Sequence, residues 1–171
     1  MPLENVSVLP EQVAAIDKLR QHFPVDADMT LQILKGHLII EEALREIFEL
    51  LLISPGALQG EKGASFNCHQ IICLVEALAP KRSDKMKWVW SAAKQLNNLR
   101  NDMAHKLNPQ GLDSKIQSFL RNVRESDPEV RAQFQNSGAP ESLHFAMAIS
   151  TLLGLFSRMR SHVALTLQSG T

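Results

Sequence analysis

Apolar residues in this 171-residue chain recur every three or four positions, and nowhere do polar and apolar residues alternate over the length of a strand. The segment with Ile40, Leu44, Ile47 and Leu51 shows this helical spacing clearly. Prolines and glycines interrupt the pattern at several points, so the chain divides into successive helices. The sequence therefore predicts an all-α fold, a single-domain helical bundle with mostly antiparallel neighbours.

The interruptions in the apolar pattern predict the approximate ends of about six to seven helices within one domain, residues 1–171. The expected helices cover about residues 10–22, 28–53, 65–78, 83–107, 113–124 and 128–138, and a long last helix covers about 141–167. Ser65 is expected to cap the third helix, and Ser83 or Asp84 the fourth. Residues 57–65 are expected to form a surface loop.

Composition and the first residues bear on where the protein works. The chain is 44% apolar and 21% charged, which is typical of a soluble globular protein. Its start has neither a basic nor an apolar region of the kind that directs secretion. Polar residues such as His144 and Ser150 interrupt the apolar last helix, so we interpret that helix as buried and not as a membrane span. A cytoplasmic protein without membrane contact is expected.

Two cysteines, Cys68 and Cys73, lie five positions apart on one expected helix. This spacing suits neither a disulfide nor a CxxC site, and we interpret both as core thiols. A zinc site that used them with His69 would need further ligands, which the sequence does not identify. Neither a metal nor another cofactor is therefore expected.

Charge is unevenly distributed along a chain whose formal net charge is zero. Residues 1–80 carry five basic and eleven acidic side chains, whereas residues 81–124 carry ten basic and three acidic ones. We call residues 81–124 the basic segment; it includes Lys94, Arg100 and Lys106. Such a segment suits a phosphate-binding surface. The alternative is that it neutralises the acidic residues 1–80 within the fold.

The sequence LNNLRNDMAHK, residues 96–106, lies within the basic segment and places Arg100 five positions before His105. An apolar stripe on the same expected helix should face the core; it consists of Val89, Ala92, Leu96, Leu99 and Met103. At about 100° per residue, Arg100 and His105 lie about 140° apart around the helix, too far to grip one phosphate easily. The spacing alone does not indicate a site within one chain.

A second copy of the chain would remove this geometric difficulty. The arc from Arg100 to His105 also carries Trp90, Ala93 and Ala104, which suit close helix packing. If the arc packs against its own copy across a two-fold axis, two arginines and two histidines converge in one cleft. The geometry therefore favours a homodimer. Trp88 and Trp90 are more typical of a core or an interface than of a base-stacking surface.

These residues resemble the signature of the HEPN domain superfamily. Asn97 to His105 match the form N-x-x-R-N-x-x-A-H near the end of a long helix, and residues 36–52 look like the preceding long helix of that family. The resemblance covers about residues 28–124, with the helix at about 141–167 outside this part. It implies a dimeric, metal-independent endoribonuclease, typical of toxins and of antiviral defence systems.

The resemblance also implies roles for individual residues. His105 would move a proton at a ribose 2′-hydroxyl or at the leaving 5′-oxygen, and Arg100 would hold the scissile phosphate. Asn101 would complete the catalytic group by orienting these side chains. The expected substrate-binding residues are Asn97, Lys94, Lys106 and Glu41.

Alternatives remain for the same residues and for the whole chain. Arg100 could form an ordinary ion pair with Asp102 or another acidic residue, and the helix dipole favours a histidine near a helix C-terminus. His37, Glu41 and Arg45 could be a simple ladder with i to i+4 spacing. The chain could also be a non-catalytic regulatory or adaptor module that binds a protein, nucleic acid or nucleotide.

One departure from the family concerns its regulation. Some toxins of the superfamily carry a tyrosine two residues after the histidine, where a cognate antitoxin modifies them by nucleotidylation. This chain has Leu107 there and no tyrosine at all. That mode of control is therefore not implied, although an antitoxin or regulatory protein partner of another kind remains an expectation, together with RNA as the substrate.

Overall fold

A computed structural model describes residues 10–59, 63–79, 86–106, 109–135 and 139–169. The described residues form helices and contain no strand, so the prediction of an all-α fold is confirmed. In chain order the elements are α1 (Pro10–His22), α2 (Met29–Leu51), the 3-10 helix η1 (Pro55–Leu58), α3 (Cys68–Leu78), α4 (Lys87–His105), α5 (Leu112–Arg124), α6 (Pro128–Phe134) and α7 (Glu141–Ser169).

The start of α3 differs from the prediction. Asn67, and not Ser65, is the N-cap: its side chain accepts a hydrogen bond from the backbone N–H of Gln70 at 3.0 Å. The side chain of Gln70 accepts one in return from the backbone N–H of Asn67 at 3.0 Å. This reciprocal pair satisfies two backbone donors, which Ser65 could not have achieved with Cys68 three residues later. The predicted caps Ser83 and Asp84 lie outside the described residues.

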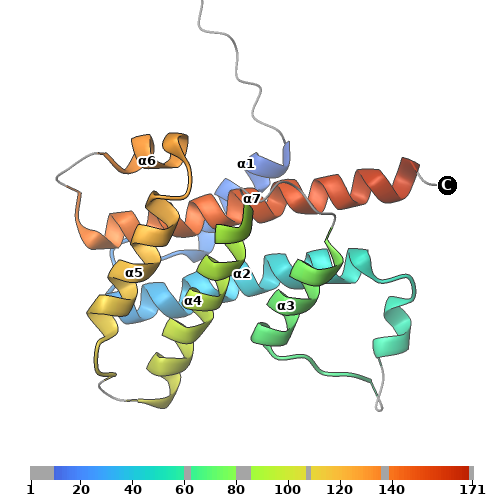
Figure 1. Cartoon of the computed structure of the whole chain (residues 1–171), viewed down its shortest axis with the longest axis horizontal. Coiled ribbons are helices and arrows are strands. Elements are labelled where there is room, and N and C mark those ends of the chain that lie inside the picture. The colour runs from blue at the N-terminus through green and yellow to red at the C-terminus, as the bar shows by residue number, and fades with distance from the viewer. Residues whose placement is uncertain (1–9, 60–62, 80–85, 107–108, 136–138, 170–171) are drawn as a thin grey trace, which may run out of the picture.

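The helices are arranged around two long elements that lie side by side, α2 and α7 (Figure 1). Both run in the same direction in Figure 1, whereas α4 and α5 are antiparallel to each other and cross them. The expectation of mostly antiparallel neighbours therefore holds for α4 and α5 but not for α2 and α7. The intervening helices return the chain to the end of the bundle where α2 began, and α7 starts there. The surface loop predicted at residues 57–65 overlaps the end of η1, so its first two residues are helical.

The core contains one face of α7. Phe145, Ile149, Leu152 and Phe156 are fully buried, at 0% exposure, and are spaced four, three and four residues apart. This spacing places them on one side of the helix, against α1, α2 and α5. The interpretation of the last helix as buried is thus confirmed for this face, whereas residues near its end such as Leu167, at 53% exposure, are open to solvent. Within the described ranges, none of the helices combines the length and apolar character needed to cross a lipid bilayer.

The helix α4, which carries the sequence motif, is anchored in this core. Val89, Ala92, Leu96 and Leu99 are at most 1% exposed, as the apolar stripe predicted, and its fifth member, Met103, is only partly buried. The Trp90 ring packs against Phe156 of α7, with 5.8 Å between ring centroids. Such buried aromatic contacts fix the position of α4, and with it the positions from which Arg100 and His105 project.

Replacing two helical glycines, Gly36 and Gly154, by residues with side chains is expected to have opposite effects on stability. A Cβ at Gly36 would lie 2.9 Å from Cδ1 and 3.0 Å from Cγ1 of Ile149, where α2 approaches α7, whereas a Cβ at Gly154 would meet nothing within 4 Å. We expect Gly154→Ala to raise the free energy of unfolding by about 0.5–1 kcal/mol through helix propensity. Gly36→Val should lower it by about 1–3 kcal/mol through overpacking. Urea unfolding followed by circular dichroism measures both; equal effects would contradict the described helix contact.

Candidate functional site

Arg100 and His105 lie at the C-terminal end of α4 in different environments. The side chain of Arg100 is half-buried on the side facing α2, and His105 is the last residue of the helix and is exposed. The helix continues regularly between them, so the separation of about 140° around the axis and about 7.5 Å along it applies. The structure therefore does not bring these two side chains of one chain together in a single site.

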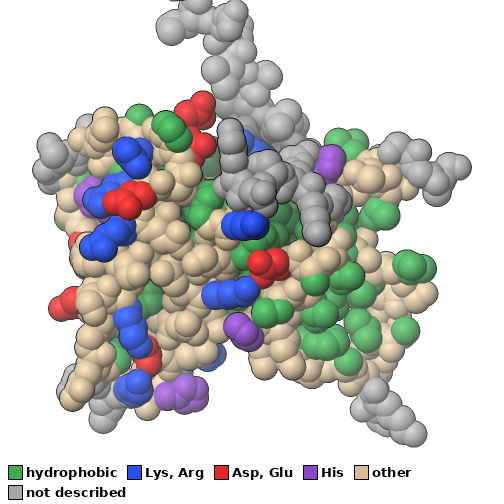
Figure 2. Space-filling model, viewed as in Figure 1, with side chains coloured by type: hydrophobic (Ala, Val, Ile, Leu, Met, Phe, Trp, Pro, Cys, Tyr) green, Lys and Arg blue, Asp and Glu red, His purple; other side chains and the backbone are tan. Residues whose placement is uncertain are grey.

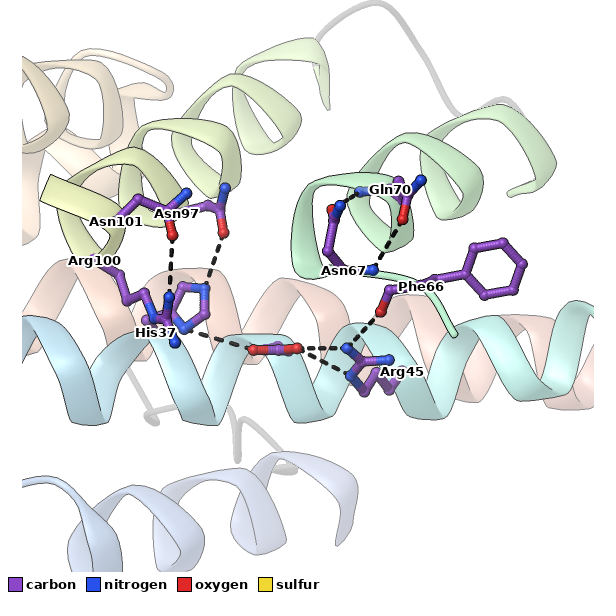
Figure 3. A network of polar contacts seen from close by, with 9 residues as sticks. His37, Arg45, Phe66, Asn67, Gln70, Asn97, Arg100 and Asn101 are labelled. Carbon is purple, nitrogen blue, oxygen red and sulfur yellow. Dashed lines mark hydrogen bonds and ion pairs between the residues drawn. The ribbon is translucent and has the colours of Figure 1, made fainter. Parts of the chain in front are cut away.

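Arg100 contacts the neighbouring predicted residue Asn101. Its Nη1 donates a hydrogen bond to Asn101 Oδ1 at 3.2 Å, and no carboxylate among the described residues lies within ion-pair distance of it. Figure 3 shows the Arg100 side chain next to the ring of His37 from α2. Within the described residues, Arg100 and Asp102 therefore do not form the ion pair that the sequence left open as an alternative. A guanidinium held only by a neutral amide keeps donors for an anion.

A buried hydrogen bond links α2 to α4 beneath Arg100. His37 and Asn97 are 4% and 5% exposed, and His37 Nε2 donates to Asn97 Oδ1 at 3.1 Å (Figure 3). Asn97 was predicted to bind substrate, but its side chain lies inside the chain and holds His37. Burial lowers the pKa of His37 below its ordinary value; the hydrogen bond that His37 donates to Asn97 and the charge of Glu41 oppose this shift, and the charge of Arg100 adds to it.

Glu41 belongs to the ladder along α2 that the sequence suggested. Its Oε1 accepts hydrogen bonds from Arg45 Nε at 3.0 Å and Nη2 at 2.6 Å, while Oε2 lies 3.6 Å from His37 Nδ1. Arg45 Nη2 also donates to the carbonyl of Phe66 at 3.0 Å, just before α3 begins (Figure 3). The ladder interpretation is confirmed for Glu41 and Arg45, and Arg45 also ties α2 to the start of α3. Glu41 and Arg100 both lie beside His37, but among the described contacts they form no ion pair with each other.

The cysteines occupy different environments. Cys68, the first residue of α3, is partly buried, and its pKa is raised to about 12 by burial and by the charge of Glu41. Cys73 is exposed, and its Sγ lies 3.7 Å from His69 Nε2. The interpretation of both as core thiols is therefore wrong for Cys73. Its position five residues after Cys68 on one helix turns it about 140° away, toward solvent.

The predicted substrate-binding lysines are engaged in ion pairs. Lys94 Nζ lies 2.6 Å from Glu76 of α3, and Lys106 Nζ lies 2.8 Å from Asp102. Lys115 of α5 also pairs with Asp102. On the face in Figure 2, basic side chains over α4 and α5 lie among acidic ones and do not form a continuous basic surface. The alternative that the basic segment neutralises acidic residues within the fold is thus supported for Lys94.

The pair of lysines around Asp102 predicts an acid-dependent contribution to stability. Hydrogen bonds from Lys106 and Lys115 lower the pKa of Asp102 to about 2. Its unfolded-state pKa lies near 4, so this stabilisation is complete above about pH 4 and is lost as the pH falls through about 2. We expect Asp102→Asn to destabilise the protein at neutral pH and to have a smaller effect near pH 2.5. Urea unfolding at the two pH values tests this; a pH-independent difference would contradict it.

The arc proposed for a two-fold contact is partly used within the chain. Trp90 and Ala93 are 9% and 2% exposed in the described structure, and Asn97 is buried as well. These residues pack inside the bundle because α4 lies between α2, α3, α5 and α7, and not at its edge. Of the residues in that arc, Ala104 and His105 are exposed and Arg100 and Asn101 are half-exposed. A contact with a second copy would thus be restricted to the end of α4.

Sequence reasoning missed the position of His37 and Cys68 next to Arg100. The i to i+4 spacing of His37 and Glu41 was visible, but Cys68 joins them from another helix.

Comparisons of the chain with protein family models, with curated proteins and with solved structures found no match to any of them.

Proposed function

We propose that this chain is a metal-independent endoribonuclease that acts as a homodimer with Arg100 and His105 in its active site. The observation that carries the proposal is the state of Arg100: half-buried, bonded to Asn101 at 3.2 Å, and without an acidic partner among the described residues. Surface arginines without a carboxylate partner are well suited to hold a phosphate through paired N–H donors. The resemblance to the HEPN superfamily supports RNA as the source of that phosphate.

The separation of Arg100 from His105 supports a site built from two chains. Both project from the exposed end of α4, and within one chain they point about 140° apart. A two-fold axis near this end would place Arg100 of one chain opposite His105 of the other. Only the end of α4 is needed for this contact, which agrees with the burial of Trp90 and Ala93 inside the bundle.

The proposed reaction is an attack of the ribose 2′-oxygen on the adjacent phosphorus. As the 2′-oxygen bonds to phosphorus, His105 accepts its proton, the P–O5′ bond breaks, and the leaving 5′-oxygen takes a proton from water. Arg100 stabilises the negative charge that grows on the phosphate, and Asn101 orients its guanidinium. The products carry a 2′,3′-cyclic phosphate and a 5′-hydroxyl. The same resemblance supports a cytoplasmic role in a toxin or antiviral system, with a protein regulator.

Cleavage of end-labelled RNA by the purified chain in EDTA tests the proposal. We expect cleavage with cyclic phosphate ends, and a dimer in analytical ultracentrifugation. A folded dimer that leaves a broad set of RNAs intact would contradict the enzyme and would favour the binding module. The engagement of Asn97, Lys94 and Lys106 within the chain is the observation that favours this second function. RNA binding without cleavage, measured by fluorescence anisotropy, would identify it.

A further inference from the structure

Three potential metal ligands from two helices meet next to Arg100. The ligand atoms of His37, Glu41 and Cys68 all lie within 4.8 Å of one another. The contact depends on Arg45, which holds Glu41 and the carbonyl of Phe66 together and so places the start of α3 against α2. These three side chains supply a nitrogen, an oxygen and a sulfur ligand, a mixture that zinc and similar divalent cations accept.

The ring of His37 supplies an independent observation. Asn97 Oδ1 accepts from Nε2, so the other nitrogen, Nδ1, carries the lone pair when the ring is neutral. Nδ1 is buried, lacks a hydrogen-bond partner, and faces Glu41 Oε2 at 3.6 Å. In the neutral ring, this lone pair faces a carboxylate oxygen that offers it no hydrogen. Buried polar atoms are rarely left in this state, and a cation between the two would satisfy both.

We propose that His37, Glu41 and Cys68 bind a divalent cation of the zinc class through Nδ1, a carboxylate oxygen and Sγ, with water as the fourth ligand. Bonds of about 2.0–2.3 Å in a tetrahedral site place ligand atoms about 3.3–3.8 Å apart. The 3.6 Å between His37 and Glu41 already fits this range, and the 4.8 Å limit for the whole group requires only a small approach of the side chains. Binding releases the thiol proton of Cys68 to solvent, and the charges of the carboxylate and the resulting thiolate then balance that of the cation.

The surroundings of the cluster match those that support metal ligands. Ligating histidines commonly donate their second ring N–H to an oxygen, as His37 does to Asn97, and ligating carboxylates are themselves hydrogen-bonded, as Glu41 is by Arg45. The bound cation would join α2 to α3 and stabilise the folded chain. This inference does not depend on the ribonuclease, which is proposed to work in EDTA; either can fail without the other.

Titration of the metal-free full-length protein with Co²⁺, and with Zn²⁺ in competition, tests the site. We expect one equivalent per chain, a thiolate-to-cobalt absorption band, and a higher melting temperature with Zn²⁺. Cys68→Ser should lose the band, whereas the matched control Cys73→Ser should keep it. Asn97→Ala should weaken Zn²⁺ binding about 10- to 100-fold, because Asn97 positions the ring of His37.

A second measurement needs no variant and so does not depend on the folding of Cys68→Ser. The raised pKa of Cys68 makes it react slowly, so the incubation is extended until the metal-free protein is labelled there. Under these conditions Zn²⁺ should protect Cys68, and not Cys73, from alkylation by iodoacetamide, as read from the two labelled peptides by mass spectrometry. Absence of binding by the folded wild type overturns the proposal. Loss of the band in Cys73→Ser overturns it as well, since that would indicate a site at His69 and Cys73, which lie 3.7 Å apart. Retention of the band in both variants would also overturn it.

Discussion

His105→Ala is expected to lower the rate constant of RNA cleavage by about 10²- to 10⁴-fold, the usual contribution of a general acid or base. Arg100→Ala should lower it by about 10²- to 10³-fold, because it removes donors from the charge that develops on the phosphate. Arg100→Lys should restore little of this loss, since an ammonium group keeps the charge but not the paired N–H geometry. Single-turnover cleavage with RNA in limiting amount measures the chemical step for each variant.

The control for these variants is Arg121→Ala, which removes an exposed basic residue from α5, away from the end of α4. It should leave the rate of the chemical step nearly unchanged, and circular dichroism should show all four variants folded. Equal losses in Arg121→Ala and Arg100→Ala would mean that general charge, and not a specific phosphate contact, supports cleavage. Wild-type rates in His105→Ala would remove His105 from the site.

Mixing the two inactive variants tests whether the site is composite. In a mixed dimer, the chain with Arg100→Ala still supplies His105, and the chain with His105→Ala still supplies Arg100, so one intact pair forms across the two-fold axis. After random exchange of subunits, activity should recover to at most about a quarter of the wild-type level, because half the dimers are mixed and each has one of two pairs. A site within one chain would show no recovery, because neither variant contains both residues.

Phe156→Ala is expected to give the largest loss of stability, about 3–5 kcal/mol, because it removes a ring from a fully buried position. The ring contacts Trp90 at 5.8 Å between centroids, and its removal leaves a cavity between α4 and α7. For a chain of this size the melting temperature should fall by about 6–20 °C. Urea and thermal unfolding followed by circular dichroism provide the two measurements.

Leu167→Ala on the same helix is the matched control. Leu167 is 53% exposed, so its truncation should change the free energy of unfolding by about 0.5 kcal/mol or less. Comparable losses in the two variants would mean that α7 does not bury the face that contains Phe156. Selective loss in Phe156→Ala would confirm that the helix carrying Arg100 and His105 is positioned by this contact.

The helices themselves could be predicted from the sequence because their signals are local. Pro10 and Pro128 at helix starts, and the apolar spacing along α2 and α4, depend on interactions between residues a few positions apart. The cap of α3 was misassigned because Ser65 and Asn67 are both good caps, and the choice depended on the partner three residues later, Gln70.

The motif at Arg100 and His105 was likewise visible in the sequence, including their separation around one helix, because an α-helix has a fixed angle per residue. What the sequence did not determine is which residues of α4 the rest of the chain covers. Trp90 and Asn97 have the same periodicity whether they face a second copy or their own core. Only the packing of α4 against α2 and α3, together with the contact of Trp90 with Phe156 of α7, decided that they lie inside.

The sequence by itself determined the all-α fold, the positions of most helices and the angular relation of Arg100 to His105, since each depends on backbone geometry and nearby residues. The tertiary structure alone decided that His37, Asn97 and Arg100 meet, and that Cys68 joins His37 and Glu41. Asn97 is 60 residues from its partner His37. Contacts over such separations depend on how whole helices pack, and no local pattern of residues encodes them.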